Sequence, residues 1–324
     1  MFHSMSIRVI AIIAAGLGQV SAVAADEARL SPYILGKAVT GTQEEVVATV
    51  KAALKAQGFE EAGSYSPYAG ASVIVVTNGE LRLVAAKAKN GGFGAGQRVA
   101  VTNTNKGIQV SYVNPAYLAA AYGLGSLDIT AAKLKAALGS EKEFGSEAGY
   151  TAADLAIYRY NGMLMMPNFT SVDALASHAS HAEAVQTIER NLAAGKGGTK
   201  KVYRIDLPGR ETSVFGVAIV SGDGIDKGDK DTDREIMDIV DWKPLRHTAY
   251  LPYEVLVQGK EVIALRGRYR IAPGIRMPQQ GSQTRQHGRH NERRDCRTVE
   301  LRPRLPCERD PRIHLGRFTH QPRR

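Results

Sequence analysis

The feature that most limits how this chain folds is a series of short strand-like runs that come in adjacent pairs. Residues 98–103 and 108–113, for example, flank Asn105-Lys106-Gly107, whose residue types are typical of a hairpin turn. Hairpins join antiparallel strands, and helix-like segments separate one group of strands from the next. The sequence therefore predicts an α+β protein in which a curved antiparallel sheet is backed by helices.

The expected elements follow from side-chain periodicity and from residues that begin or end helices. Thr42 and Glu45 form a capping box, which starts a helix with apolar residues at helical spacing as far as Gly58. Asn78-Gly79 is a strong hairpin signal, so the runs on either side of it are expected to be paired strands. The expected strands are 33–40, 71–77, 80–86, 98–103, 108–113, 155–160, 201–206, 213–220, 253–258 and 261–271. The further expected helices are 116–122, one that begins at Ser171 or Ser180 and ends near Leu192, and 234–241.

Two stretches of the chain repeat a similar order of strand, helix and hairpins. The first covers residues 31–140 and the second covers residues 150–271. The agreement lies in the pattern of elements and not in residue identity. We therefore expect two α+β units, with internal duplication as a hypothesis for their origin.

Three short motifs resemble those of a known family. They are Val110-Ser111-Tyr112-Val113-Asn114-Pro115, Ser180-His181-Ala182-Glu183-Ala184-Val185 and Leu251-Pro252-Tyr253-Glu254. With the pattern of helix and hairpins over about residues 33–271, they make the chain similar to the bacterial family of domains of unknown function numbered 302. The resemblance implies one curved antiparallel sheet backed by two helices, like the TATA-binding protein in outline. It implies no particular activity.

The N-terminal residues 1–25 have the pattern of a cleavable signal peptide. Arg8 supplies a positive charge, residues 9–17 are apolar, and Ala22-Val23-Ala24 satisfies the rule of small residues before a cleavage site. No other stretch reaches about 18 consecutive apolar residues. We therefore expect a periplasmic or secreted protein without a membrane span.

The basic charge is concentrated at the C-terminal end. Residues 272–324 contain 13 Arg, no Lys and five acidic residues, a net charge of +8, whereas the rest of the chain has a net charge of +2. A nearly neutral body argues against nucleic-acid binding. Cys296 and Cys307 also fall in this tail, so the body is expected to contain no disulfide. The tail is expected to be disordered, either as the product of a reading-frame shift or as a natural basic arm.

A possible metal site involves two histidines three residues apart. If one helix contains both His178 and His181, adjacent turns bring their rings to one side. Met163, Met165 and Met166 could add thioether sulfur, a combination that suits copper. The alternative is that the histidines cap a helix or hydrogen-bond in the core while the methionines fill gaps.

Two loops deserve comparison with known ligand-binding loops. Asp229, Asp231 and Asp233 have the spacing of the first ligands in a calcium loop, although Arg234 and Val240 exclude an EF-hand. A looser cation site or a solvated turn remains. The glycine-rich segment 90–96 lacks nucleotide-binding spacing and is expected to be a mobile loop over a cavity.

The sequence leaves three functions open. The first is a non-enzymatic exported protein that binds a small molecule or a partner protein. The second is a copper-handling protein. The third is a hydrolase or isomerase whose acid–base groups meet only in the fold. Candidates for such a ligand-binding site are His181, His247 and Glu254.

Overall fold

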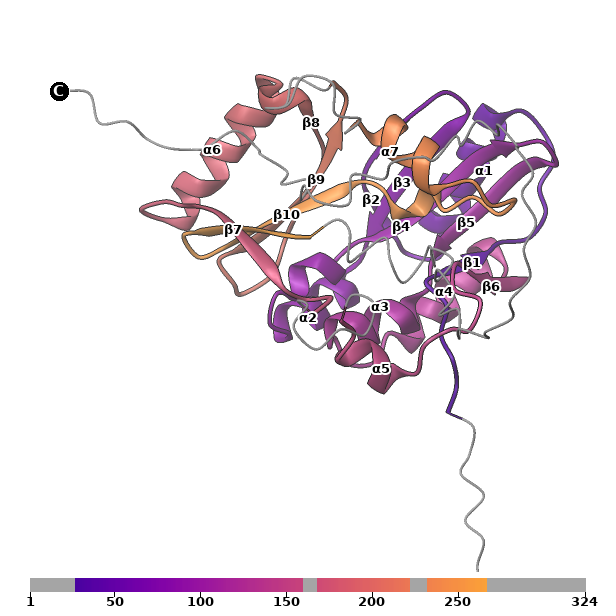
Figure 1. Ribbon diagram of the computed structural model, residues 1–324, viewed down its shortest axis with the longest axis horizontal. Helices are drawn as coiled ribbons and strands as arrows, with labels where there is room; N and C mark the ends of the chain where they lie inside the picture. Colours follow the sequence, from indigo (N-terminus) through magenta and orange to yellow (C-terminus); the bar gives the residue numbers. More distant parts are fainter. Residues whose placement is uncertain (1–26, 160–167, 222–231, 267–324) are drawn as a thin grey trace, which may run out of the picture.

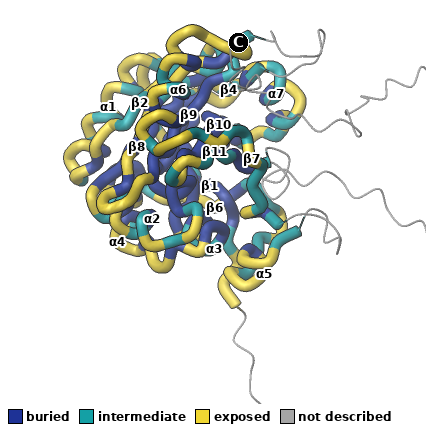
Figure 2. The backbone as a smooth tube through the Cα atoms, turned by 90° about the vertical axis from the view of Figure 1, so that its left-hand side faces the viewer, coloured by how far each residue is buried: buried dark blue, intermediate teal, exposed yellow. Residues whose placement is uncertain are grey.

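The computed structural model describes residues 27–159, 168–221 and 232–266 and confirms the predicted α+β class. These residues form two antiparallel sheets rather than one (Figure 1). In Figure 1, one sheet lies at the right beside α1 (Gln43–Ala56), and the other lies at the left beside α6 (His181–Ala193). The central strands of both sheets are largely buried, whereas the edge strands are more exposed and the helices expose one side to solvent (Figure 2).

The first sheet contains six strands in the order β2-β3-β4-β5-β1-β6. Their bounds are β1 Tyr33–Leu35, β2 Glu60–Tyr65, β3 Ala71–Thr77, β4 Gln97–Thr104, β5 Gly107–Val113 and β6 Lys142–Phe144. Helices α1 (Gln43–Ala56) and α4 (Asp128–Leu138) pack on its outer face. The predicted capping box starts α1, because Thr42 Oγ1 accepts from Glu45 N and Glu45 Oε2 accepts from Thr42 N.

The second sheet contains five strands in the order β7-β11-β10-β9-β8. Their bounds are β7 Val172–Ser177, β8 Thr199–Asp206, β9 Thr212–Ile219, β10 Tyr253–Gln258 and β11 Glu261–Leu265. Helix α6 (His181–Ala193) covers the outer face of this sheet. Its buried residues, among them Val185 and Ile188, pack with Phe215, Val217 and Val255 in a small hydrophobic core of their own.

The two halves share one topology. In each half the first strand is followed by a helix and four further strands, and the spatial orders β2-β3-β4-β5-β1 and β8-β9-β10-β11-β7 correspond. Each second strand has a bulge, between Glu61 and Gly63 in β2 and between Lys201 and Tyr203 in β8. These two strands also contact each other. Duplication as the origin of this correspondence stays a hypothesis.

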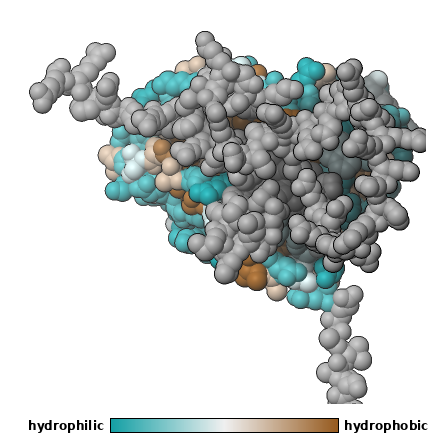
Figure 3. Space-filling view, in the orientation of Figure 1, coloured by the Kyte–Doolittle hydropathy of each residue, from teal (hydrophilic) through white to brown (hydrophobic). Residues whose placement is uncertain are grey.

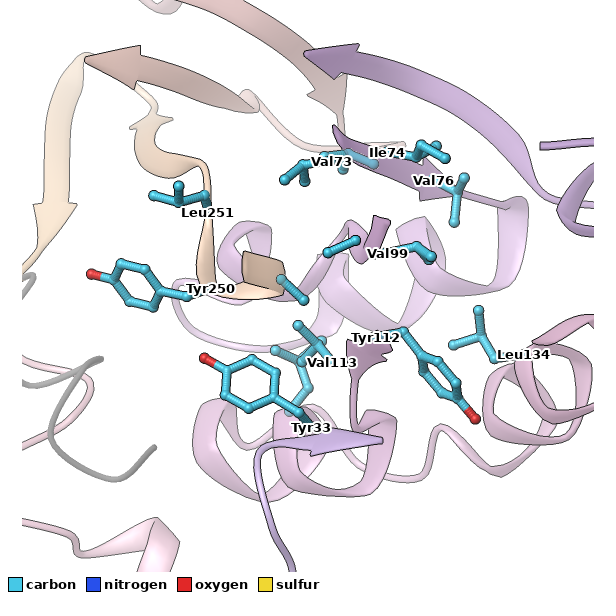
Figure 4. Packing of buried hydrophobic residues seen from close by; sticks show 14 of the residues in the cluster. Tyr33, Val73, Ile74, Val76, Val99, Tyr112, Val113, Leu134, Tyr250 and Leu251 are labelled. Atoms are coloured by element: carbon cyan, nitrogen blue, oxygen red, sulfur yellow. The ribbon is translucent and has the colours of Figure 1, made fainter. Parts of the chain in front are cut away.

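The halves are interlocked through the segments that connect their third and fourth strands. In the first half this segment contains α2 (Gly79–Lys87) and the 3-10 turn η1 (Gly91–Gly94), and η1 packs on β9 and β10 of the second sheet. In the second half it contains α7 (Asp233–Val240) and the turn η4 (Thr248–Tyr250), and η4 packs on β3, β4 and β5 of the first sheet. Figure 4 shows Tyr250 with side chains of the first sheet. One hydrophobic core therefore extends across both halves.

The glycine-rich segment 90–96 is not the mobile loop that was expected, since η1 is buried inside this shared core. A Cβ on Gly92 would lie 2.3 Å from Leu256 Cδ1 of β10, and one on Gly94 would lie 2.3 Å from Leu124 Cδ1. The glycines are needed because the second sheet and the first half approach this turn too closely for any side chain.

Two predicted strands were wrong. Residues 80–86 belong to α2, because Asn78 caps that helix by accepting from Leu81 N instead of opening a hairpin. The strand predicted at 155–160 is also wrong, because its first two residues belong to the short helix α5 (Ala152–Ala156). Thr151 and Asp154 form the capping box that starts this helix. Strands β2, β6 and β7 and helix α4 were not predicted. Helix α3 (Pro115–Tyr122) follows Asn114-Pro115 as expected.

Several predictions lie outside the described residues, namely the signal peptide at 1–25, the tail at 272–324 and the end of the strand predicted to reach residue 271. Within the part of the chain that the structure describes, no helix combines the length and apolar character needed to cross a membrane. Where described residues are visible in Figure 3, the hydrophobic ones form small, separate patches.

Because the two halves interlock at η1, a side chain added at position 92 should destabilise the whole fold. The variant Gly92→Val should lower the free energy of unfolding by about 1–3 kcal/mol, because its side chain must displace Leu256 of the other half. Urea unfolding followed by circular dichroism measures the loss.

The matched control is Gly79→Ala, at a helical position with open space around the added Cβ. It should be neutral or should raise stability by about 0.4–1 kcal/mol. Equal effects of the two substitutions, or two separate unfolding transitions in the parent, would contradict the interlocked core.

Candidate functional site

The histidine pair predicted to bind copper does not lie on adjacent turns of one helix. His178 precedes the N-cap Ser180, and His181 is the first residue of α6. The helix start at Ser171 is wrong, because the segment after it forms β7. His178 Nδ1 lies 4.0 Å from Glu183 Oε1, whereas His181 Nε2 lies 3.2 Å from Ser213 Oγ.

The described residues give little other support for a metal site. They contain no cluster of three or more His, Cys, Asp or Glu side chains that could hold a metal ion. Met163, Met165 and Met166 lie outside the described residues, as do Asp229 and Asp231 of the candidate calcium loop.

His181 takes part in a chain of hydrogen bonds that does not activate a nucleophile. Ser213 Oγ donates to Asp206 Oδ1 at 2.5 Å. A hydroxyl has one proton, so Ser213 accepts from His181 Nε2 rather than donating to it. A catalytic serine needs the reverse arrangement, in which the imidazole accepts the hydroxyl proton.

Asp233 is a buried residue and not part of an open carboxylate loop. It is the first residue of α7, and its Oδ2 accepts a hydrogen bond from the Tyr65 hydroxyl of β2 at 2.8 Å. Burial raises the pKa of the Asp233 carboxyl from 3.8 to about 7.

Glu254 joins the two sheets. Its Oε2 accepts from Arg98 Nη1 of β4 at 3.1 Å, and its Oε1 accepts from the Tyr203 hydroxyl of β8 at 2.6 Å. The Arg98 and Glu254 side chains are only 6% and 1% exposed. A buried charged pair with these bonds is a structural link between the two halves.

Arg98 and Glu254 occupy corresponding positions in the two halves. Arg98 pairs with the fifth residue of β3, Val75, and Glu254 pairs with the fifth residue of β9, Gly216. Gly216 must lack a side chain, because a Cβ there would lie 2.0 Å from Cε1 of the Tyr203 ring. This close approach allows Tyr203 to reach Glu254.

His247 forms a buried pair with a residue that the sequence analysis did not single out. Its Nδ1 lies 2.8 Å from Asp241 Oδ1, and its backbone N–H donates to the same oxygen at 2.9 Å. Both side chains are at most 2% exposed. The rings of Tyr33 and Phe144 lie 5.4 and 5.5 Å from the imidazole, centroid to centroid.

Two atoms of this pair, His247 Nε2 and Asp241 Oδ2, have no hydrogen-bond partner among the residues that the structure describes. Buried polar atoms are nearly always hydrogen-bonded, and a site that leaves them unpaired calls for an explanation. The pair gives no pattern in the sequence, because the two residues are six positions apart in an irregular segment.

Hydrogen bonds to the first sheet hold the segment that contains the pair. Gln109 Nε2 donates to the Arg246 carbonyl at 2.7 Å, and Arg246 N donates to Gln109 Oε1 at 2.9 Å. Thr248 Oγ1 bonds to Thr102 Oγ1 at 2.9 Å and to the Tyr68 hydroxyl at 2.8 Å. We call this contact, between residues 233–248 and the inner face of the first sheet, the polar seam.

Comparison of the chain with protein-family models, curated proteins and solved structures found no match. The resemblance to the bacterial family of domains numbered 302 therefore stays a prediction. We take the polar seam as the candidate site because, among the described residues, both members of its titratable pair, His247 and Asp241, have a buried side-chain atom without a hydrogen-bond partner.

Removing one partner of the ion pair between the sheets should be strongly destabilising. We expect Arg98→Met to lower the free energy of unfolding by about 3–5 kcal/mol, because the buried Glu254 carboxylate loses its cationic partner. Combining it with Glu254→Gln should cost clearly less than the sum of the two single losses. Lys51→Met removes an exposed ion pair and should cost less than about 1 kcal/mol. An Arg98→Met loss no larger than this control would contradict the assigned role.

The buried carboxyl of Asp233 should make stability depend on pH. Between about pH 4 and 7 the folded protein keeps a proton that the unfolded chain has lost, so the free energy of unfolding should fall as pH rises through this range. Each unit by which the pKa is raised corresponds to about 1.4 kcal/mol. Asp233→Asn should flatten this slope, whereas Asp238→Asn, at an exposed position, should not. Identical slopes for parent and Asp233→Asn, in urea titrations from pH 4 to 8, would contradict the raised pKa.

Proposed function

We propose that this is an exported, non-enzymatic binding protein that holds a small ligand in the polar seam, against His247 and Asp241. The observation that supports the proposal is that two buried atoms, His247 Nε2 and Asp241 Oδ2, have no hydrogen-bond partner in the described part of the chain. A buried polar atom without a hydrogen bond costs about 1–3 kcal/mol. A ligand that bonds to both atoms would remove that cost on binding.

Export is part of this proposal and rests on the pattern of residues 1–25, which lie outside the described residues. An exported binding protein needs a fold that stays intact without cytoplasmic partners. The interlocked core supports such a role, since two sheets share one hydrophobic cluster.

A hydrolase or isomerase is the second candidate, and the orientation of the same pair favours it. Asp241 accepts from His247 Nδ1, which leaves Nε2 as the atom that could take a proton from a substrate. Catalysis further requires a reacting group next to Nε2, and binding does not. Binding is therefore the simpler role for the geometry. The copper alternative has less support, because His178 and His181 contact different neighbours.

Native mass spectrometry tests the proposal. Protein purified without denaturation from the cells that produce it should show a non-covalent adduct of small mass. His247→Phe should lose the adduct, because Phe fits beside Tyr33 and Phe144 but offers no acceptor. His181→Phe changes a histidine on the outer face of the other sheet and should keep it.

Two outcomes would count against the proposal. One is a parent protein with the mass of the bare chain. The other is an adduct that His247→Phe retains. Release of a chemically altered product from an added mixture of metabolites would favour the enzymatic alternative.

A further inference from the structure

Strand β7 is the longest edge strand whose outer side has no strand beside it among the described residues. The first sheet ends at β2 and β6, and the second ends at β7 and β8. Edges β2 and β8 contact each other, and a Cβ on Gly63 of β2 would lie 2.1 Å from the carbonyl oxygen of Val202 in β8. Edge β6 has three residues, whereas β7 has six.

The corresponding edge of the first half is closed by an additional strand. Strands β1 and β7 hold the same place in the two sheets, since β1 pairs with β5 and β7 pairs with β11. Strand β6 pairs with the other side of β1. In the described part of the second half, no strand takes the place of β6. Edge strands present a row of backbone N–H and C=O groups that can pair with another extended segment.

The side chains of β7 suit a neighbouring strand. Val172 packs against the core that the two halves share, and Leu175 and Ala176 pack against the small core under α6, yet all three are only half-buried. Figure 2 shows β7 as intermediate or exposed along its length. Of the devices that keep sheet edges apart, β7 has a bulge at Leu175 and one acid, Asp173, which Arg266 binds, but no Lys or Pro.

The charges at the two ends of β7 favour a second copy of this chain as the partner. Arg266 lies beside the first residues of β7, where it bonds to Asp173. Beside the last residues of β7, the carboxylates of Glu183 and Glu261 outnumber the one lysine, Lys260. In an antiparallel pair of identical strands, the first residues of one copy lie beside the last residues of the other. The arginine end therefore meets the more acidic end, and the two copies of Asp173 stay apart.

A second copy also closes the edge without creating a new one. We propose that β7 is an interface at which two copies of this chain join their second sheets, antiparallel and about a twofold axis. Both copies contribute the same strand, so the dimer uses both open edges and does not extend further. The chain itself already places two equivalent edges together, since β2 and β8 hold the same place in their sheets and contact each other.

Sedimentation velocity of the full-length protein, from low micromolar to submillimolar concentration, tests this interface. A concentration-dependent dimer is expected. Ala174 is exposed and near the middle of β7, so it lies close to its own copy across the twofold axis. Ala174→Lys should weaken the dimer about tenfold or more, because it places two like charges together. The control Ala136→Lys, at an exposed position of α4, should dimerise as the parent does.

A mixture of charge variants distinguishes pairing between two copies from any other contact. Ala174→Glu should also weaken the dimer, and an equal mixture of Ala174→Glu with Ala174→Lys should restore it, because opposite charges then meet across the axis. A partner other than a second copy gives no such rescue. Circular dichroism shows whether each variant is folded. If neither variant folds, the concentration series of the parent decides.

Three results would overturn the proposal. The first is a parent protein that stays monomeric at every concentration. Slow amide hydrogen exchange in β7 of that monomer would show that another segment of the chain covers the edge, and fast exchange would show that the edge stays open. The second is a dimer that Ala174→Lys leaves unchanged. The third is a dimer that both Ala174 variants weaken and their mixture does not restore.

Discussion

The guanidinium of Arg98 and the carboxylate of Glu254 meet between the inner faces of the two sheets, where water hardly reaches either side chain. Tyr203 adds a hydrogen bond to the same carboxylate. Burying two charges is costly, and their attraction offsets that cost only when the geometry is right. The pair therefore selects one relative position of the sheets. Arg98 and Glu254 occupy corresponding positions in the two halves. The ion pair therefore also holds the two halves in alignment with each other.

The interlocking turns depend on this alignment. In each half, the connection between the third and fourth strands packs on the inner face of the other sheet. The first half makes this contact through η1 and the second half through η4. The contact at η1 is apolar, and it is too close for a side chain at Gly92 or Gly94. At η4 it is partly apolar, through Ala249 and Tyr250, and partly polar, since Thr248 bonds to Thr102 and Tyr68. Gln109 bonds to Arg246, just before the turn. The His247–Asp241 pair lies at the start of η4, so the packing of the halves also places the candidate site.

Local chemistry explains what could be predicted from the sequence. The capping box at Thr42 and the hairpin at residues 105–107 depend on residues close together in the chain, and the structure confirms both. Asn78-Gly79 was misread because the same asparagine that favours a turn also caps a helix. The prediction of a mobile loop at segment 90–96 is wrong because Gly92 is needed for close packing against Leu256, a residue far away in the sequence.

The candidate site could be predicted only in part. His247 and Glu254 were singled out as ionisable residues, but their partners Asp241 and Arg98 were not. Arg98 pairs across 156 residues, and no pattern in a single sequence reveals such a contact. Asp241 is near His247 in the chain, yet an irregular segment between them gives no periodicity from which to predict that their side chains meet.

The electron density around His247 Nε2 and Asp241 Oδ2, in crystals of protein purified from its natural source, tests the central claim most directly. The account predicts continuous density for a small molecule within hydrogen-bond distance of both atoms. Density for isolated water molecules alone, or protein side chains bonded to both atoms, would contradict it.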